Sequence, residues 1–175
     1  MKRLKTLLFA LFFCGSLFAQ DKKITYTQFD VTIAFTGNPK SGEVDQYTNE
    51  KEPWLIPDGI GSKLGYGLRY KKWVGLGIHG GLNWDWSNKL VVVPIYANFR
   101  LSPKIGEETR ITLQLGLGKA IALGRGNLTG DYKKISIGIQ NDNDILLFEV
   151  NHYAFPINNQ RDSGNISLGI SSISF

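Results

Sequence analysis

The sequence has little cysteine and little histidine, and this limits the chemistry available to it. Cys14 is the single cysteine and lies in a segment that we expect to be removed, which leaves no disulfide framework and no thiolate metal site. The bulky Phe13 before it disfavours lipidation of this cysteine. Apolar runs are short, and no apolar period of 3.6 residues extends over a useful length, so a helical membrane protein is excluded. Without disulfides, order must come from packing and hydrogen bonding.

The first residues have the pattern of an export signal. Basic residues precede a short apolar run at residues 7–13, and small residues follow it. We expect a signal peptide at residues 1–19, with cleavage after Ala19 or, as the alternative, after Ser16. The apolar run is shorter than the roughly 20 residues that a spanning helix needs, which argues against a membrane anchor.

Removal of the leader changes the charge and leaves one domain. Three positive charges leave with it, so the formal net charge falls from +5 to +2. Nucleic-acid binding then loses its compositional support, and we expect no nucleic acid among the partners. The remaining residues 20–175 fit a single domain.

Alternation with a period of two organises the chain, most clearly at residues 59–84. Between Ile60 and Tyr70 the even positions are mostly apolar or aromatic, while the odd positions carry glycine, lysine or arginine. This period predicts a strand. The pattern resumes at residues 74–84 after the short break at 71–73, so it predicts two long strands joined by a tight turn.

The same alternation along the rest of the chain predicts about eight strands. They cover approximately residues 29–35, 60–70, 74–84, 91–101, 110–121, 134–140, 146–153 and 166–175. Lys119 falls on an apolar face, which predicts a rim position or a bulge. Ile173 and Phe175 have the opposite parity to Ile166 and Ile170, so either a bulge at Ser171-Ser172 resets the register or the face assignment fails there.

The connections between these strands alternate in length. Those after odd strands (36–58, 85–88, 124–130 and 156–165) are mostly longer than those after even strands (71–73, 102–108 and 141–144). Long outer loops, short inner turns and an even number of strands are typical of a transmembrane β-barrel with both termini in the periplasm. The sequence therefore predicts an all-β, eight-stranded antiparallel up-and-down transmembrane β-barrel.

Aromatic residues gather near the ends of these strands, as in the belts of a membrane barrel. The threading places one group at the outer ends and another at the inner ends: Phe35, Trp84, Trp86, Tyr132 and Phe155, and Phe29, Tyr70, Trp73, Phe99 and Phe175. Because alternation alone does not identify the solvent, an exported soluble β-barrel that carries an apolar ligand remains the alternative.

The export signal, the eight alternating strands, the loop asymmetry and terminal Phe175 together resemble the small outer-membrane β-barrels of Gram-negative bacteria, the OmpA/OmpX-type and the broader outer-membrane β-barrel domain families. The resemblance implies location in the outer membrane and contact with its lipid and lipopolysaccharide. It implies that Phe175 belongs to an assembly signal for periplasmic chaperones and the barrel assembly machinery. Such barrels serve as adhesins, anchors, small pores and enzymes, so the resemblance leaves the role of this protein open. We expect the outer loops to bind an extracellular ligand, whose identity is unknown.

Motifs that resemble catalytic or cofactor sites do not have the context those sites need. Residues 75–80 satisfy GxGxxG, but the alternation runs through them and no helix follows. Neither His79 nor His152 has a serine placed as nucleophilic catalysis requires, and the His-x-Ser pattern of barrel deacylases is absent. Asp142 and Asp144 lack the spacing of a calcium loop. We expect no enzymatic activity, no catalytic residues, no cofactor and no metal.

Charged residues on the inward face predict a polar network in the lumen. Its expected members are Asp30, Lys63, Arg69, Arg100, Arg110, Lys134 and Glu149. Because an eight-stranded barrel is only about wide enough to be filled by side chains, these groups should be neighbours. We expect Glu149 to be shared by Arg69 and Arg100, which can grip a carboxylate with two donors. A plugged lumen is favoured over a narrow, anion-favouring pore lined by the inward glycines.

Overall fold

The computed structural model describes residues 24–45, 48–124, 128–155 and 162–175. The signal peptide expected at residues 1–19 and both of its alternative cleavage sites lie outside these residues. Within the described part of the chain, no helix is long and apolar enough to cross a membrane.

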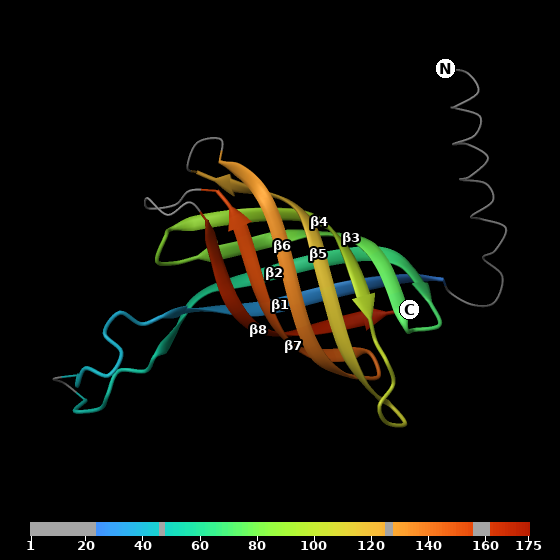
Figure 1. Cartoon of the computed structure of the whole chain (residues 1–175), viewed down its shortest axis with the longest axis horizontal. Coiled ribbons are helices and arrows are strands. Elements are labelled where there is room, and N and C mark those ends of the chain that lie inside the picture. Colours follow the sequence, from blue (N-terminus) through green and yellow to red (C-terminus); the bar gives the residue numbers. More distant parts are fainter. Residues whose placement is uncertain (1–23, 46–47, 125–127, 156–161) are drawn as a thin grey trace, which may run out of the picture.

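Eight antiparallel strands form a closed barrel in which every strand pairs with its neighbours in sequence (Figure 1). β1 also pairs with β8, which closes the cylinder. The strands are β1 (Thr25–Gly37), β2 (Leu55–Tyr70), β3 (Val74–Asp85), β4 (Leu90–Leu101), β5 (Thr109–Leu123), β6 (Thr129–Asn141), β7 (Asp144–Ala154) and β8 (Ser163–Ser174). The predicted eight-stranded up-and-down barrel is confirmed.

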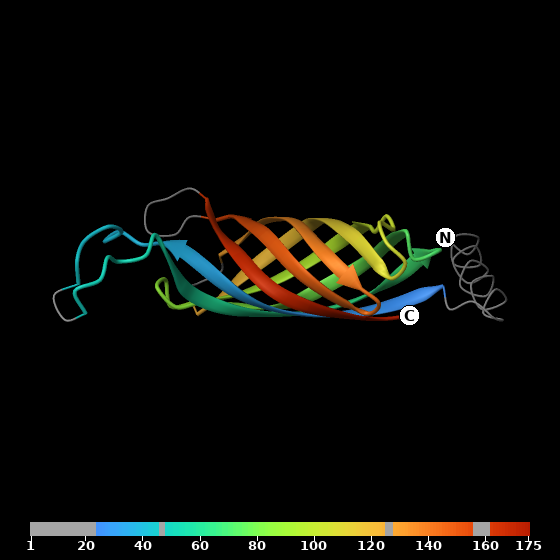
Figure 2. The ribbon, with the colours of Figure 1, turned by 90° about the horizontal axis from the view of Figure 1, so that it is seen from below.

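Two ends of the barrel differ in character, and we name them by what they carry. The terminal end holds the start of β1, the end of β8 and the connections at 71–73, 102–108 and 142–143, whereas the loop end holds the other connections, among them the long one between β1 and β2 (Figure 2). At the first short turn, Lys71 and Lys72 have φ values of 50° and 60° and Trp73 N–H donates to the Tyr70 carbonyl at 3.0 Å. Positive φ at both central residues is the requirement of a type I′ turn, whose twist matches that of the strands it joins.

Alternate residues along each strand point into the lumen and towards the outside, and the two sets differ in polarity. In β4, for example, Val92, Tyr96 and Asn98 are buried in the lumen, while Ile95 and Phe99 are exposed on the outer wall. The same pattern holds around the barrel, so polar residues, glycines and several tyrosines fill the lumen and large aliphatic side chains cover the outside. This is the reverse of a water-soluble domain.

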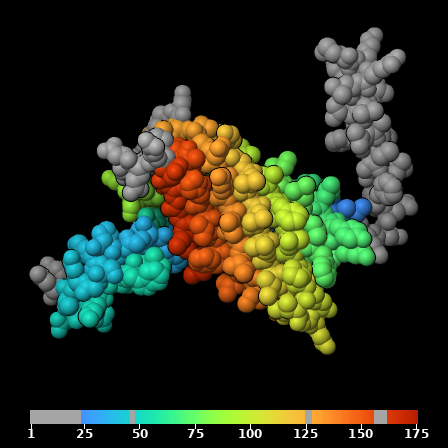
Figure 3. Space-filling view, viewed as in Figure 1, coloured from blue at the N-terminus to red at the C-terminus, as the bar shows by residue number. Residues whose placement is uncertain are grey.

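One connection is more ordered than the sequence suggested. The expected loop 36–58 is shortened at both sides, because β1 continues to Gly37 and β2 already begins at Leu55. β1 pairs with β8 only up to Phe35 and β2 pairs with β3 only from Gly59. Residues 36–45 and 48–56, which we call the arm, therefore pair only with one another and project beyond the barrel wall (Figures 1 and 3).

Backbone hydrogen bonds hold the described part of the arm together. Asn38 N–H donates to the Trp54 carbonyl at 2.9 Å, and Glu52 N–H donates to the Glu43 carbonyl at 2.8 Å. A β-bridge joins Val44 to Lys51. The arm is a distorted hairpin built on the first two strands.

A β-bulge lies where the arm leaves the barrel. Ala34 pairs with Gly59 and Phe35 with Pro57, so Asp58 is the extra residue. Its carboxylate accepts a hydrogen bond from Ser87 N–H at 2.9 Å, and its carbonyl accepts one from Trp86 N–H at 2.8 Å. The bulge thus ties the base of the arm to the neighbouring β3–β4 connection.

Three aromatic positions and one aliphatic position differ from the expectations. Tyr132 and Phe155, predicted for the outer belt, are buried inside the barrel, where their parity with Lys134 and Tyr153 places them. Ile173 is also buried, and no register shift occurs at Ser171-Ser172, so the face assignment was wrong there. Phe175 packs against the buried cluster at the terminal end instead of joining the outer wall.

Lys119 needs no bulge to explain it, because the pairing of β5 is regular on both sides. Its side chain points outward near the loop end and forms an exposed ion pair with Asp131, at 2.6 Å. The pair lies on adjacent strands, since Lys119 and Asp131 are direct partners in the ladder. A rim position, the other expectation for Lys119, agrees with this geometry.

Candidate functional site

The lumen holds the polar residues expected there, at two heights. Asp30, Lys63, Lys134 and Glu149 are buried at the centre, each at most 1% exposed. Arg100 is buried closer to the terminal end, and Arg69 and Arg110 are half-buried there. The lumen is the one candidate site that sequence reasoning defined.

Two carboxylates and two ammonium groups form the central network. Lys63 Nζ donates to Glu149 Oε1, and Lys134 Nζ lies 3.1 Å from Glu149 Oε2 and 3.5 Å from Asp30 Oδ2. Asn151 Nδ2 also donates to Glu149 Oε1, at 2.8 Å, so this carboxylate has several charged or polar donors. The two positive and two negative charges of these four side chains balance, which lowers the large cost of burying them.

The expected contact of Glu149 with Arg69 and Arg100 is not formed. Glu149 pairs across the ladder with Ser136 and Ser167, whereas Arg100 lies opposite Gly75 and Gln114 near the terminal end. Alternation assigns a side chain to the inside of the barrel, but the tilt and stagger of the strands decide its height, and these could not be read from the sequence.

Arginine side chains at the terminal end contact aromatic rings instead. The Arg100 guanidinium carbon lies 4.7 Å from the Tyr26 ring centroid and 5.6 Å from that of Phe175, and the Arg69 carbon lies 4.2 Å from the Phe175 ring. Cations over ring faces gain electrostatic stabilisation, more so when they are desolvated. Phe175 therefore helps to close the terminal end of the lumen.

A column of aromatic rings crosses the lumen from one end to the other. Successive ring centroids lie between 4.9 and 6.2 Å apart, in the order Tyr26, His79, Tyr96, Tyr132, Tyr153 and Phe155. These distances are typical of stabilising ring contacts. Tyr132 and Phe155 were predicted to lie on the outer wall. Their inward parity in the sequence could have placed them in the lumen.

Inward glycines make room for this column. A Cβ on Gly65 would lie 2.2 Å from an atom of the His79 ring, and one on Gly116 would lie 2.7 Å from the Tyr96 ring. The space beside each of these glycines is therefore filled by a ring from the neighbouring strand, since His79 is the ladder partner of Gly65 and Tyr96 lies on the strand next to Gly116. The expectation was that side chains from the opposite wall would fill it.

Apolar clusters close the lumen above and below the charges. At the loop end the cluster consists of Leu90, Val92, Tyr96, Ala120, Ala122, Tyr132, Tyr153 and Phe155. At the terminal end Tyr26, Ile145, Leu147 and Ile173 pack together, with Phe175 against them. A neutral charge network between two apolar plugs is suited to holding the barrel rigid and unsuited to passing ions.

Neither histidine lies in an arrangement suited to nucleophilic catalysis. His79 Nε2 lies 3.3 Å from the Tyr26 hydroxyl oxygen and 3.4 Å from Asn98 Nδ2, both in the column region. His152 is on the outer side and lies 3.8 Å from Asp162. Among the residues that the structure describes, no group of three or more His, Cys, Asp or Glu side chains could hold a metal ion.

Comparison with solved structures identifies the fold. No family model matches the chain, and no curated protein does. Neisserial surface protein A (NspA) matches with a TM-score of 0.51 and 14% sequence identity, over 85% of this chain and 96% of that one. The attachment invasion locus protein Ail of Yersinia pestis has a TM-score of 0.43 and 12% identity, over 86% of this chain and 97% of that one.

Both neighbours are small eight-stranded outer-membrane β-barrels of Gram-negative bacteria. The likeness to NspA concerns the fold, and it agrees with the closed eight-stranded ladder described above. The chain thus has the fold of a small outer-membrane β-barrel, as its alternation and loop pattern predicted.

Replacing Glu149 by alanine should destabilise the barrel. Lys63 and Lys134 would keep their buried charges and lose their shared carboxylate, which costs about 3 to 5 kcal/mol in the free energy of unfolding. Thermal unfolding of the purified protein in detergent, followed by circular dichroism, measures the effect. Asp131→Asn removes the exposed partner of Lys119 and serves as the control, with little change expected. An unchanged melting temperature for Glu149→Ala would contradict the central network.

Replacing Gly65 by alanine should also lower the melting temperature. The new methyl group would overlap the His79 ring, which is held between Tyr26 and Tyr96, and overpacking of this kind costs about 1 to 3 kcal/mol. Gly80→Ala is the matched control, because its Cβ would point outward with its nearest atom at 3.4 Å. Equal melting temperatures for the two variants would show that the ring column does not depend on the glycine wall.

Proposed function

We propose that this protein is an integral outer-membrane β-barrel without enzymatic activity, which acts as a rigid anchor and presents the arm at the cell surface. The observation that carries the proposal is the combination of an apolar outer wall with a lumen that is filled by side chains and whose central charges balance. The first requires lipid around the barrel, and the second leaves the outer connections as the parts available for interaction.

The outer wall is too apolar for water. Ile78, Leu117 and Leu146 are 71%, 65% and 63% exposed, and comparable side chains surround the whole barrel. Burying one such side chain is worth about 1.5 to 3 kcal/mol, so a continuous band of them left in water would drive aggregation. Acyl chains satisfy this surface, and Trp73 and Trp84 lie near its two edges, where rings are favoured at the headgroup level.

The arm supports the surface-interaction role. Its base is fixed by the bulge at Asp58, and its own backbone bonds give it a shape of its own, so it is held out from a rigid scaffold. Trp54 and Val44 on it are 73% and 53% exposed. Exposed apolar side chains on a hairpin with unpaired outer edges are suited to binding another protein by packing and strand addition.

Orientation follows from the ends of the barrel. In this proposal the loop end faces the medium and the lipopolysaccharide leaflet, while the terminal end faces the periplasm. Phe175 would then serve the assembly machinery and periplasmic chaperones before it packs against Arg69 at the closed end.

Two other functions receive less support. A soluble carrier needs an apolar cavity inside the barrel, but the lumen contains a charge network and a ring column. An anion-favouring pore needs excess cations along an open path, but the central charges balance and apolar clusters lie on either side of them.

Arginine on the outer wall should prevent stable insertion. Leu115 points outward in the middle of β5, and a charge at the bilayer midplane of such a wall costs about 2 to 4 kcal/mol. Leu76 also points outward but lies beside Phe99, closer to the terminal end, so the effect there should be smaller. We expect the parent to stay in membranes through carbonate extraction, whereas Leu76→Arg and Leu115→Arg appear in membranes in reduced amounts. Lys119→Leu, on the same wall near the loop end, should insert like the parent. Release of the parent by carbonate would overturn the proposed function.

Protease added to intact cells should cut the arm and spare the barrel. Lys40 and Lys51 are exposed on it, so trypsin should leave a barrel fragment in the membrane. Lys40→Gln combined with Lys51→Gln is the matched control and should remain uncut in the arm. Full protection in intact cells, together with cleavage after the outer membrane is permeabilised, would place the arm in the periplasm.

A further inference from the structure

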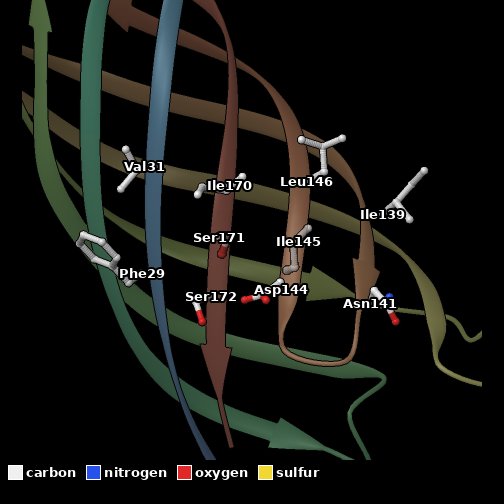
Figure 4. Close-up of a pocket in the computed structure, with 10 residues that line it drawn as sticks. All are labelled: Phe29, Val31, Ile139, Asn141, Asp144, Ile145, Leu146, Ile170, Ser171 and Ser172. Carbon is white, nitrogen blue, oxygen red and sulfur yellow. The ribbon is translucent and has the colours of Figure 1, made fainter.

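A groove of about 580 Å³ lies on the outer wall near the terminal end (Figure 4). It runs across β7 and β8, with β1 on one side and β6 on the other. Its volume is in the range of small-molecule sites. The groove belongs to the outside of the barrel, and the lumen network has no part in it.

Two neighbouring rows of the ladder line the groove and differ in chemistry. One row is apolar and consists of Val31, Ile170, Leu146 and Ile139, which are direct cross-strand partners. The next row towards the terminal end consists of Phe29, Ser172, Asp144 and Asn141, again as direct partners. On β6, β7 and β8 the change from apolar to polar therefore occurs inside the groove, from one row of the ladder to the next, while Phe29 keeps an apolar side chain on β1.

The aromatic belt is interrupted at this place. Elsewhere at the terminal end, Tyr70, Trp73 and Phe99 are exposed on the outer wall. On β7 and β8 the corresponding outward positions are Asp144 and Ser172, and the outward position beyond Ser172 is Ser174. Small polar side chains replace bulky rings here, which leaves the depression open.

The polar row contains one charged side chain, Asp144, and its carboxylate has no partner among the side chains that the structure describes. Its carboxylate is exposed and has no hydrogen bond or ion pair to any side chain in the described part of the chain. The turn it closes contains Asp142 and no basic residue. A carboxylate at the edge of an apolar groove, next to the hydroxyl of Ser172 and the amide of Asn141, offers an acceptor for a cation and donors for an anion.

We propose that this groove binds a phospholipid with a primary ammonium headgroup, such as phosphatidylethanolamine, in the periplasmic leaflet. An acyl chain occupies the apolar row, the Asp144 carboxylate accepts a hydrogen bond from the ammonium group, and Ser172 and Asn141 donate to the phosphate. A lipid with phosphate but no ammonium group meets the bare charge of Asp144 and binds more weakly. The inference rests on the proposed membrane location of the barrel.

Lipid binding to the whole protein tests the proposal directly. Native mass spectrometry in detergent compares three added lipids with the same short acyl chains: phosphatidylethanolamine, its N-acetyl derivative and phosphatidylglycerol. We expect phosphatidylethanolamine to bind about tenfold more tightly than the other two, the factor that one charge-assisted hydrogen bond implies. Equal binding of all three lipids would overturn the proposal without requiring any variant.

Variants locate the site. Asp144→Asn should abolish the preference for phosphatidylethanolamine, because the amide no longer attracts the ammonium group. Asp142→Asn is the matched control: it removes the same charge two residues away, at a position with φ 48° that asparagine tolerates, and should keep the preference. A preference that survives in Asp144→Asn, or that is lost equally in both variants, would place the recognition elsewhere.

The two proposals fail in different ways. If the parent leaves the membrane on carbonate extraction, the proposed function fails. If the parent stays in the membrane but binds the three lipids equally, the outer-membrane anchor stands and the ammonium-lipid site is wrong.

Discussion

Closure of β1 onto β8 is the constraint on which the rest of the structure depends. Once the ladder is closed, every strand has two partners along its barrel part, and no edge is left to pair with another chain. Closure with eight strands also fixes a narrow interior. The side chains that point inward then have to fit one another, which is why glycines face rings and why the lysines and carboxylates meet at the centre.

The centre of the lumen contains equal numbers of buried positive and negative side chains, which lowers the cost of burying them. Lys63, Lys134, Asp30 and Glu149 come from four different strands and together carry no net charge. The arginines, which would have added charge to this group, lie closer to the terminal end. Arg69 and Arg100 contact the rings of Phe175 and Tyr26, and Arg110 donates to the Ser102 carbonyl. Polar groups in the middle with apolar clusters on both sides favour one arrangement of these four strands, because sliding one of them would separate its charge from the others.

The sequence predicted the faces of the strands well and their heights poorly. The outward positions of Leu68 and Ile95 and the inward positions of Lys63 and Glu149 follow from parity alone. The pairing of Glu149 with lysines depends on strand stagger, which parity does not contain. Tyr132 and Phe155 were misplaced because a role in a belt was preferred over simple alternation. At Ile173 two alternatives had been left open, and the failure of the face assignment is the one that the structure shows. Backbone hydrogen bonds order the described part of the arm. These bonds could not be predicted from its polar composition, which is typical of a loop.

The bulge at Asp58 has a consequence for how such a chain can change. Because the register of the barrel is set between Ala34 and Gly59, and the arm pairs only with itself, residues can be gained or lost in the arm without moving any side chain from one face of the barrel to the other. A family of such proteins could diversify its surface segment while it keeps one folding unit. Lipid and lumen impose a parity on each barrel strand, and neither imposes one on the arm.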